Sequence, residues 1–299
     1  ISSIYKMSEL DILLNSVDNA NTKKTYRTTY NKLIGSGKFT TDISETPNLE
    51  IIKIIKGLTD NAFTRKTYLT AVIKLKRVMD VPITELELYR EQHKLDVLQH
   101  IKDNKIEPKT WKTTSGLTQN PAELTLKGFT DYVDALYKAG RYKEYIVNYL
   151  ILHYGVRSQD IDCIIVNGPS KVAPPDDNAL IVYKTKIDYI RRKYKTFKTY
   201  GEKKYIIKDK KFLKAVNALN IEDGQPLLDT PEGMRHKDGS ITKVVQRLTY
   251  KEAGEGRLFK LLIDEYKFNE AKLDELSQSR GTSRNEIMTS YTKTDLTGA

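Results

Sequence analysis

Four side chains in the second half of this sequence are of the types that could break a phosphodiester bond. In chain order they are Arg157, Lys198, Arg257 and Tyr291. A tyrosine can attack the phosphorus and conserve the bond energy as a phosphotyrosine. Two guanidinium groups can hold the non-bridging oxygens, and a lysine can protonate the leaving oxygen. The set predicts cleavage and rejoining of nucleic-acid strands without a metal ion or ATP.

The order of these residues indicates the chemistry better than any one of them does. The sequence has 19 tyrosines and 50 lysines and arginines, so Tyr291 taken alone fits an ordinary half-buried residue. The lysine has two rivals, because Lys184 and Lys195 lie in the same lysine- and tyrosine-rich stretch as Lys198. The catalytic lysine is therefore one of three candidates.

The overall charge favours a polyanionic partner. The formal net charge is +11, and lysines and arginines gain binding free energy by displacing condensed counterions from DNA. A solvated lysine surface remains the alternative for any single cluster. No metal or other cofactor is expected, because the four histidines are scattered and lack ligand spacing. Duplex DNA is the expected partner.

Composition is that of an ordinary soluble protein of the cell interior. No apolar run approaches the ~20 residues of a membrane span, and the N-terminal residues lack the pattern of a signal peptide. The single cysteine, Cys163, cannot form an internal disulfide and fits a buried small hydrophobe better than a nucleophile. We expect no membrane association and an intracellular location, wherever the target DNA lies.

The first hundred residues predict a bundle of helices with basic faces. Apolar residues recur at helical spacing around 21–34, 51–58, 61–80 and 86–98. Lys76 and Arg77 belong to the basic side of the third segment. Further cations on these helices are candidate contacts to the DNA backbone: they are Lys23, Lys24, Arg27, Arg65, Lys66 and Lys74. We expect residues 1–101 to form a DNA-clamp domain.

Residues 102–120 lose this periodicity and predict a basic interdomain linker. Lys112 is a further candidate DNA contact there, and Trp111 is expected to dock on a domain surface rather than stack on a base. Residues 121–299 predict a second, mixed domain. Helices are expected near 129–137, 142–150, 241–248 and 257–268, and strands at 179–183 and 203–207. A turn rich in serine, arginine and threonine is expected before Tyr291.

The sequence resembles the tyrosine recombinase (phage integrase) family over essentially its whole length. Residues 154–160 are similar to the family's Gly-Leu-Arg-x-x-Glu segment, and residues 197–207 to its β-hairpin. Residues 254–257 fall where the family has His-x-x-Arg, and residues 279–292 resemble its terminal motif. The resemblance implies two catalytic arginines, a catalytic lysine and a tyrosine nucleophile, which are Arg157, Arg257, Lys198 and Tyr291.

Two positions depart from the family pattern. Gly254 replaces the histidine of His-x-x-Arg, and Thr282 falls near the later His or Trp position. Arg280 is a candidate substitute there, although a phosphate contact or a solvated side chain explains Arg280 better. Asp160 matches an acidic residue that supports the family's active site, although a carboxylate that begins a helix explains it equally well. The resemblance therefore leaves open whether the chemistry is slowed, uses other groups or is lost.

The fold that the resemblance implies is two-domain and mainly α with a small β-sheet. It comprises a helical core-binding (SAM-like) domain and an α/β catalytic domain. The implied function is a site-specific recombinase or integrase, which cleaves and rejoins duplex DNA through a 3′-phosphotyrosine as a homo-tetramer on paired sites. A type IB topoisomerase and a catalytically inactive DNA-binding accessory protein are the alternatives. The amino-acid composition is rich in lysine, isoleucine and asparagine, which suggests an AT-rich genome, such as that of a virus or mobile element.

Overall fold

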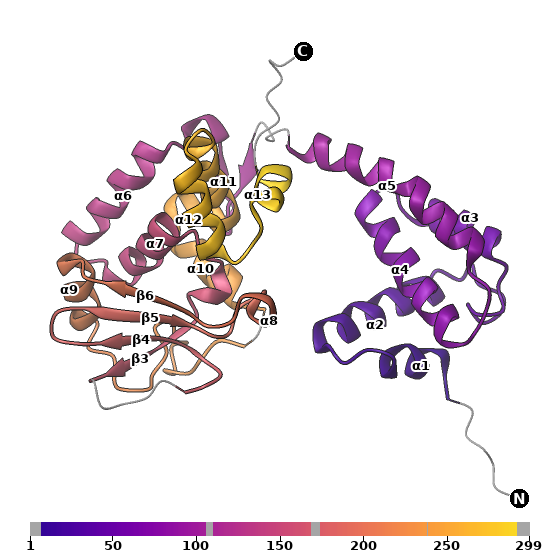
Figure 1. Ribbon diagram of the computed structural model, residues 1–299, viewed down its shortest axis with the longest axis horizontal. Helices are drawn as coiled ribbons and strands as arrows, with labels where there is room; N and C mark the ends of the chain where they lie inside the picture. Colours follow the sequence, from indigo (N-terminus) through magenta and orange to yellow (C-terminus); the bar gives the residue numbers. More distant parts are fainter. Residues whose placement is uncertain (1–6, 106–109, 169–173, 238, 292–299) are drawn as a thin grey trace, which may run out of the picture. The chain divides into compact units, whose positions relative to one another are not determined.

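The computed structural model describes residues 7–105, 110–168, 174–237 and 239–291 of the chain. The chain is mainly helical with small sheets, and it divides into two compact units, Ile1–Asn104 and Lys105–Ala299 (Figure 1). Among the described residues, no helix combines the length and the apolar character needed to cross a bilayer. Each unit encloses an apolar core of its own.

The first unit is built from helices that pack around one apolar cluster. They are α1 Glu9–Asn15, α2 Ala20–Ile34, α3 Asn48–Leu58, α4 Ala62–Val78 and α5 Thr84–Lys105. The side chains of Asn19 and Asn61 accept backbone N–H bonds from the first turns of α2 and α4, which fixes where these helices begin. Buried residues of α1 to α5 then close the core, among them Leu13, Leu33 and Leu69.

Lys76 does not lie on the basic side of α4, where the sequence suggested it. Its side chain is buried, and Nζ donates to the Thr46 carbonyl oxygen at 2.6 Å and to Asn48 Oδ1 at 2.9 Å. Burial lowers the pKa of Lys76, while the nearby carboxylates of Glu85 and Glu9 oppose the decrease. Lys76 is thus an internal tie between α4 and the segment that leads into α3.

A four-stranded sheet forms one layer of the second unit. Its strands are β3 Cys163–Asn167, β4 Asn178–Val182, β5 Ile187–Arg191 and β6 Lys203–Ile207, in that spatial order. The pair β3–β4 is parallel and the other pairs are antiparallel. Cys163 is fully buried in β3, and burial raises the pKa of its thiol, as expected for a residue that packs rather than reacts.

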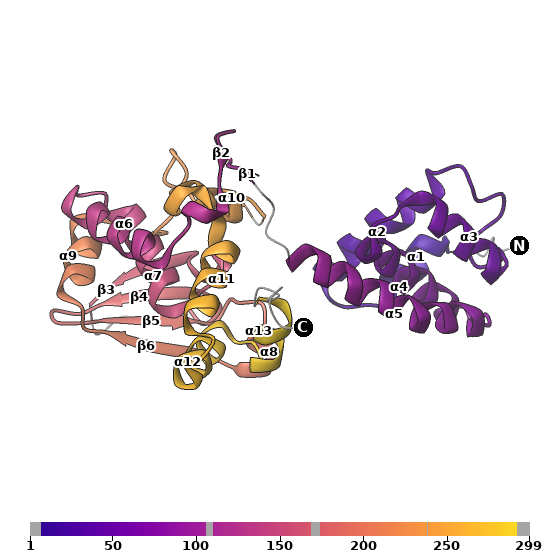
Figure 2. The ribbon, with the colours of Figure 1, turned by 90° about the horizontal axis from the view of Figure 1, so that it is seen from above.

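Helices cover one side of this sheet (Figures 1 and 2). They include α6 Leu126–Lys138, α7 Tyr142–Tyr154, α9 Lys210–Ala218, α10 Ile241–Leu248, α11 Gly254–Tyr266 and α12 Glu270–Arg280. Alternate residues of the strands, such as Ile165, Leu180 and Tyr189, point into the core that these helices share. Short helices α8 Phe197–Tyr200 and α13 Arg284–Ser290 complete the unit.

The part of the expected linker that the structure describes belongs partly to the second unit. Strands β1 Trp111–Lys112 and β2 Thr118–Gln119 pair as a short antiparallel ribbon. Trp111 is buried in the core of the second unit, while Lys112 is exposed. Residues 106–109 lie outside the described residues. Burial of the Trp111 side chain therefore makes the second half of this segment part of the second unit. The proline and glycine residues of the segment had indicated a linker instead.

Candidate active site

The turn after α7 brings Arg157 and Asp160 together. Gly155 ends α7 with φ of 57°, and a Cβ at this position would lie 2.7 Å from the Phe259 ring. Glycine is therefore needed both for the left-handed backbone and for the close approach. The chain then enters the 3₁₀ turn Ser158–Asp160, where the Arg157 N–H donates to Asp160 Oδ2 at 3.0 Å.

Asp160 forms a buried ion pair with an arginine that the sequence did not single out. Arg191 ends β5, and its Nη2 lies 2.6 Å from Asp160 Oδ2, with both side chains at 0% exposure. The Asp160 carbonyl oxygen also accepts the Tyr189 hydroxyl at 2.8 Å. Burial raises the pKa of Asp160, and the surrounding guanidinium groups oppose that increase. Asp160 thus ends the helical turn, caps its start through the Arg157 N–H and pairs with Arg191.

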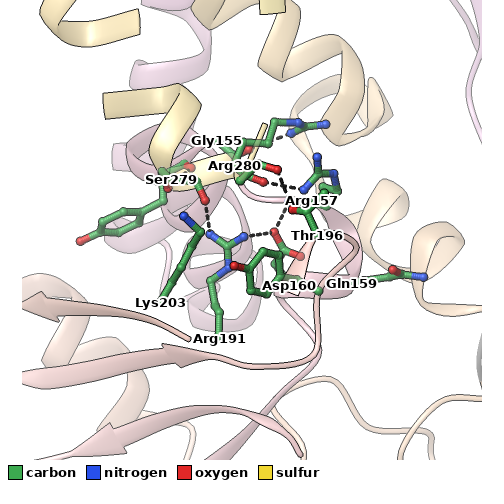
Figure 3. Close-up of polar contacts among 12 residues, drawn as sticks. Gly155, Arg157, Gln159, Asp160, Arg191, Thr196, Lys203, Ser279 and Arg280 are labelled. Carbon is green, nitrogen blue, oxygen red and sulfur yellow. Dashed lines mark hydrogen bonds and ion pairs between the residues drawn. The ribbon is translucent and has the colours of Figure 1, made fainter. Parts of the chain in front are cut away.

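The C-terminal end of α12 is the acceptor for side chains from four other positions (Figure 3). Four successive carbonyl oxygens, of Gln278, Ser279, Arg280 and Gly281, accept bonds from Lys203, Arg191, Arg157 and Thr196, in that order. The Arg191 bond is 2.6 Å long and the Arg157 bond 2.5 Å. Helix C-termini leave such carbonyls unpaired and carry partial negative charge, so they attract cations.

The turn expected before Tyr291 is present at residues 281–283, but its first residues belong to α12, a helix that the sequence did not indicate. Its last residue is Arg280, and Gly281 ends it in the left-handed conformation with φ of 63°. A Cβ on Gly281 would lie 2.7 Å from Thr196 Oγ1 and 3.4 Å from Lys203 Cε. The glycine therefore allows the helix end to approach the cationic side chains closely.

Arg280 is buried behind the candidate nucleophile. It is 2% exposed, with Nη1 donating to the Gly155 carbonyl oxygen at 2.7 Å and Nη2 to Glu255 Oε2 at 2.9 Å. Its guanidinium carbon lies 3.9 Å from the Phe259 ring centre and 5.2 Å from that of Tyr291. The sequence suggested Arg280 as a substitute acid–base group; the structure makes it a support for Tyr291.

Tyr291 directly follows α13 and is partly exposed. Its ring meets the Phe259 ring edge-on, with centroids 5.0 Å apart. Burial lowers the pKa of Arg157, as does the Arg280 charge, whereas proximity to Tyr291 raises it. Arg157, Arg280 and Tyr291 consequently belong to one electrostatic group.

Lys203 is the lysine that the structure brings into this group. It begins β6 directly opposite Arg191, is partly exposed, and has its Nζ near the Tyr200 ring. Burial and the Arg191 charge lower the pKa of Lys203. The three lysines suggested by sequence, Lys184, Lys195 and Lys198, are all exposed, with Lys198 on α8. Strand pairing could have indicated Lys203 only if β5 had been recognised.

The second expected arginine, Arg257, lies on the first turn of α11 together with Glu255. The side chains of these two residues make different contacts. Glu255 reaches Arg280, whereas the Arg257 guanidinium stacks over the Trp111 ring with 4.9 Å between carbon and centroid. Thr282 is partly exposed, and its N–H donates to the Ser277 carbonyl oxygen at 3.1 Å. The geometry thus unites Arg157, Asp160, Arg280 and Tyr291 and places Arg257 against Trp111.

Positive charge dominates the site. The cations Arg157, Arg191, Arg280 and Lys203 surround two carboxylates, Asp160 and Glu255. Arg191 and Arg280 are buried, so Arg157 and Lys203 are the members that an entering anion can meet. Guanidinium and ammonium groups are the donors that phosphoryl chemistry requires.

The first unit carries the candidate DNA contacts on α2 and α4. Lys24, Arg27 and Lys66 are exposed, and Lys23 and Lys74 are partly exposed. A groove of about 400 Å³ runs between the two helices, and lysine, threonine and aromatic side chains line it. Arg65 differs, because its Nε donates to the Thr59 carbonyl oxygen at 2.7 Å and its Nη2 pairs with Asp60.

Comparisons with known proteins leave the family open. Within the described residues, no three histidine, cysteine or acidic side chains are grouped to hold a metal ion. No protein-family model and no curated protein matches the sequence. Among solved structures, the chain is similar to a crystal structure of XerA recombinase, with a TM-score of 0.39 and 13% identity. That match covers 96% of this chain and 94% of the other.

Proposed function

We propose that this protein is a DNA recombinase that cleaves and rejoins duplex strands through Tyr291. The observation that carries the proposal is the grouping of Tyr291 with Arg157, Lys203 and the Asp160–Arg191 pair. Cations of the chain supply the positive charge that a transferring phosphate needs. The resemblance of the sequence to tyrosine recombinases points to the same chemistry.

In the proposed step, the Tyr291 oxygen attacks the phosphorus and the phosphorus–O5′ bond breaks. The phenolic proton passes to solvent, and the leaving 5′ oxygen takes a proton from a lysine ammonium group. The product is a 3′-phosphotyrosine, and attack by a 5′ hydroxyl reverses the step without a high-energy cofactor. Arg157 holds a non-bridging oxygen through the fork of its guanidinium group.

Lys203 is our candidate for the acid, ahead of Lys198. A lysine with a lowered pKa gives up its proton more readily, and Lys203 adjoins the arginines whereas Lys198 is exposed on α8. Arg257 remains the proposed second phosphate-binding arginine, carried by the α11 turn that also carries Glu255. In this scheme Trp111 would hold the Arg257 guanidinium plane in a fixed orientation.

The complete proposed reaction is site-specific recombination on duplex DNA. The exposed cations of α2 and α4 would hold the backbone, and four copies on paired sites would exchange strands. A type IB topoisomerase would use the same covalent step as a monomer. An inactive DNA-binding protein is a second candidate, because Arg191 and Arg280 are buried and the Arg157 Nη1 is already bonded to a carbonyl.

Covalent trapping on nicked duplexes tests the proposal. The duplexes are drawn from the flanks of the gene, and the reaction contains no magnesium. We expect a denaturant-stable protein–DNA adduct that Tyr291→Phe abolishes, while Tyr266→Phe, a substitution elsewhere in the second unit, retains it. Strand exchange between two duplexes then supports a recombinase, and relaxation of supercoiled plasmid by monomer supports a topoisomerase. Binding to a verified target without any adduct would overturn the catalytic proposal.

A further inference from the structure

Two cations lie directly opposite each other on neighbouring strands of the sheet. Arg191 ends β5 and Lys203 begins β6, and the two are register partners in the antiparallel pair. Like charges in this position repel each other and destabilise a sheet. The arrangement therefore needs a compensating interaction, and the structure provides one for Arg191 and another for Lys203.

Arg191 is buried and paired through both terminal nitrogens, so it has no access to a substrate. Its Nη2 pairs with Asp160 at 2.6 Å, its Nη1 donates to the Ser279 carbonyl oxygen at 2.6 Å, and its side chain is 0% exposed. Its guanidinium carbon lies 5.0 Å from the Tyr194 ring centre. An arginine does not lose its proton in a protein, so this position carries a permanent positive charge.

Lys203 is held less tightly and lies nearer to solvent. Its Nζ donates to the Gln278 carbonyl oxygen and lies 5.2 Å from the Tyr200 ring centre. The lysine is therefore free to exchange a proton, whereas its cross-strand partner Arg191 is not.

We propose that Arg191 is a positioning residue with two effects on the cleavage site. Its fixed charge keeps Lys203 ready to transfer a proton to the leaving oxygen, and its pairing with Asp160 holds the turn that carries Arg157. The inference rests on the proposed function, since it assigns Arg191 a role in that same cleavage step.

The electrostatics agree with this geometry. Burial and then the Arg191 charge lower the pKa of Lys203, and Asp160 acts in the opposite direction. The other charged or titratable groups around this pair include Tyr189, Cys163, Arg157, Arg280, Tyr194, Tyr200 and Tyr205. Among all these groups Arg191 is the cation that faces Lys203 across the strands.

A purely structural ion pair is the competing explanation, and the leaving group separates the two. A substrate with sulfur in place of the bridging 5′ oxygen departs as a thiolate, which needs no proton. If Arg191 acts through proton transfer, this substrate restores the rate. If Arg191 only maintains the fold, both substrates are slowed equally.

The experiment compares single-turnover cleavage of oxygen and sulfur substrates by four variants. We expect Arg191→Met to slow the oxygen substrate about tenfold, part of the contribution of a general acid, and the sulfur substrate less than about threefold, through the turn that carries Arg157. Lys203→Met should show the same rescue from a larger defect. Arg191→Lys should recover most of the oxygen rate, because it keeps the charge. Arg192→Met, a neighbour bonded to Glu202, is the matched control.

Direct titration of Lys203 in DNA-free protein completes the test. The ¹³Cε signals of labelled lysines are followed with pH, and Lys203→Arg identifies the Lys203 signal. We expect its pKa to rise towards the ordinary lysine value in Arg191→Met. If that variant does not fold, Arg191→Gln with Asp160→Asn is compared with Asp160→Asn alone. An unchanged titration, or equal slowing on both substrates, overturns the inference. A shifted titration in a wild-type protein that forms no adduct overturns the proposed function alone.

Discussion

Lys76 and Lys203 are two lysines with lowered pKa values in different units of this protein, and their neighbours differ in sign. Lys76 is buried in the first unit, bonded to neutral oxygens, with Glu9 and Glu85 nearby. Lys203 is partly exposed in the second unit and faces Arg191. Carboxylates favour the ammonium form of Lys76, whereas the cation favours loss of the proton from Lys203. A lowered pKa therefore marks a structural tie in one unit and a candidate acid in the other.

The same contrast applies to the arginines and lysines of the two units in general. Cations on α2 and α4 extend into solvent and can follow a DNA backbone in many positions. Cations around Asp160 are each bonded to a defined carbonyl or carboxylate oxygen. Charge count alone indicates attraction to DNA, but fixed geometry is what bond cleavage requires.

Replacing each of the two lysines by methionine is the strongest test of the comparison. Lys203→Met should slow strand cleavage by about 10²–10⁴-fold, the usual contribution of a general acid, with little change in stability. Lys76→Met should leave the cleavage rate unchanged and lower the free energy of unfolding by about 1–3 kcal/mol, because two buried oxygens lose their donor. Cleavage kinetics and urea unfolding of both variants measure this. Exchanged outcomes would falsify the assignment of roles.

Removing one partner of the buried Asp160–Arg191 pair is expected to have the next largest effect, which is on stability. Asp160→Ala leaves Arg191 charged and uncompensated in the interior, so we expect a loss of about 3–5 kcal/mol in the free energy of unfolding. Asp131→Ala, which removes an exposed partner of Lys127, serves as the control and should change stability little. Chemical denaturation of both variants measures the difference. A loss below about 1 kcal/mol for Asp160→Ala would show that the pair is not a structural centre.

A smaller effect is expected where the helix end approaches the cations. Gly281→Ala should cost about 1–3 kcal/mol, because its φ of 63° and the 2.7 Å approach of Thr196 Oγ1 both disfavour a Cβ. Gly116→Ala, also at a positive φ but with open space around it, isolates the contribution of backbone strain. Equal costs in the two variants, measured by thermal unfolding, would show that the close approach contributes nothing.

The smallest effect concerns Lys204, which lies next to Lys203 on β6. The pKa of Lys204 is raised, whereas that of Lys203 is lowered. A side-chain hydrogen bond with Asp188 raises the pKa of Lys204. The bonds from Lys204 and Lys186 outweigh burial and lower the pKa of Asp188. Since a carboxyl group with a lowered pKa in the folded state binds fewer protons than in the unfolded state, its stabilisation is complete above the ordinary carboxyl pKa of about 4. It is lost as the pH falls through the folded value.

Asp188→Asn should therefore reduce the dependence of stability on pH in the acid range. Unfolding of the variant and the wild type, followed by denaturant titration at several pH values below about 5, measures this. Asp176→Asn, at a site without an ion pair to any described residue, is the control. The interpretation fails if the free energy of unfolding of the Asp188 variant falls with decreasing pH as steeply as that of the wild type.

Helical periodicity was sufficient to predict much of this fold. The segments around Tyr26, Leu69 and Val133 became α2, α4 and α6, and Gly155 ends α7 as expected. Strand β5 was not assigned as a strand of its own, because its buried Asp188 and Arg191 gave it no clear apolar alternation within the lysine- and tyrosine-rich stretch. Helix α12 was not predicted, since few of its residues are apolar and pairing with distant side chains stabilises its end.

The site could be predicted only in part for the same reason. Arg157 and Asp160 are close in sequence, and the structure places them together as local spacing suggested. Arg191 and Lys203 come together through strand register, which one sequence does not specify when one strand is missed. The assignments of Lys198, Arg257 and Tyr291 to catalysis remain predictions for the cleavage assay.

The carbonyls at the end of α12 also determine when the cationic group can be completed during synthesis. The four bonds that they accept join positions 75, 85, 88 and 123 residues apart in the chain. A nascent chain that has reached β6 already contains Arg157, Arg191 and Lys203, but it does not yet contain their acceptors. Closing such long loops costs conformational entropy before any contact compensates for it. The cations therefore cannot reach their final arrangement before α12 has been synthesised.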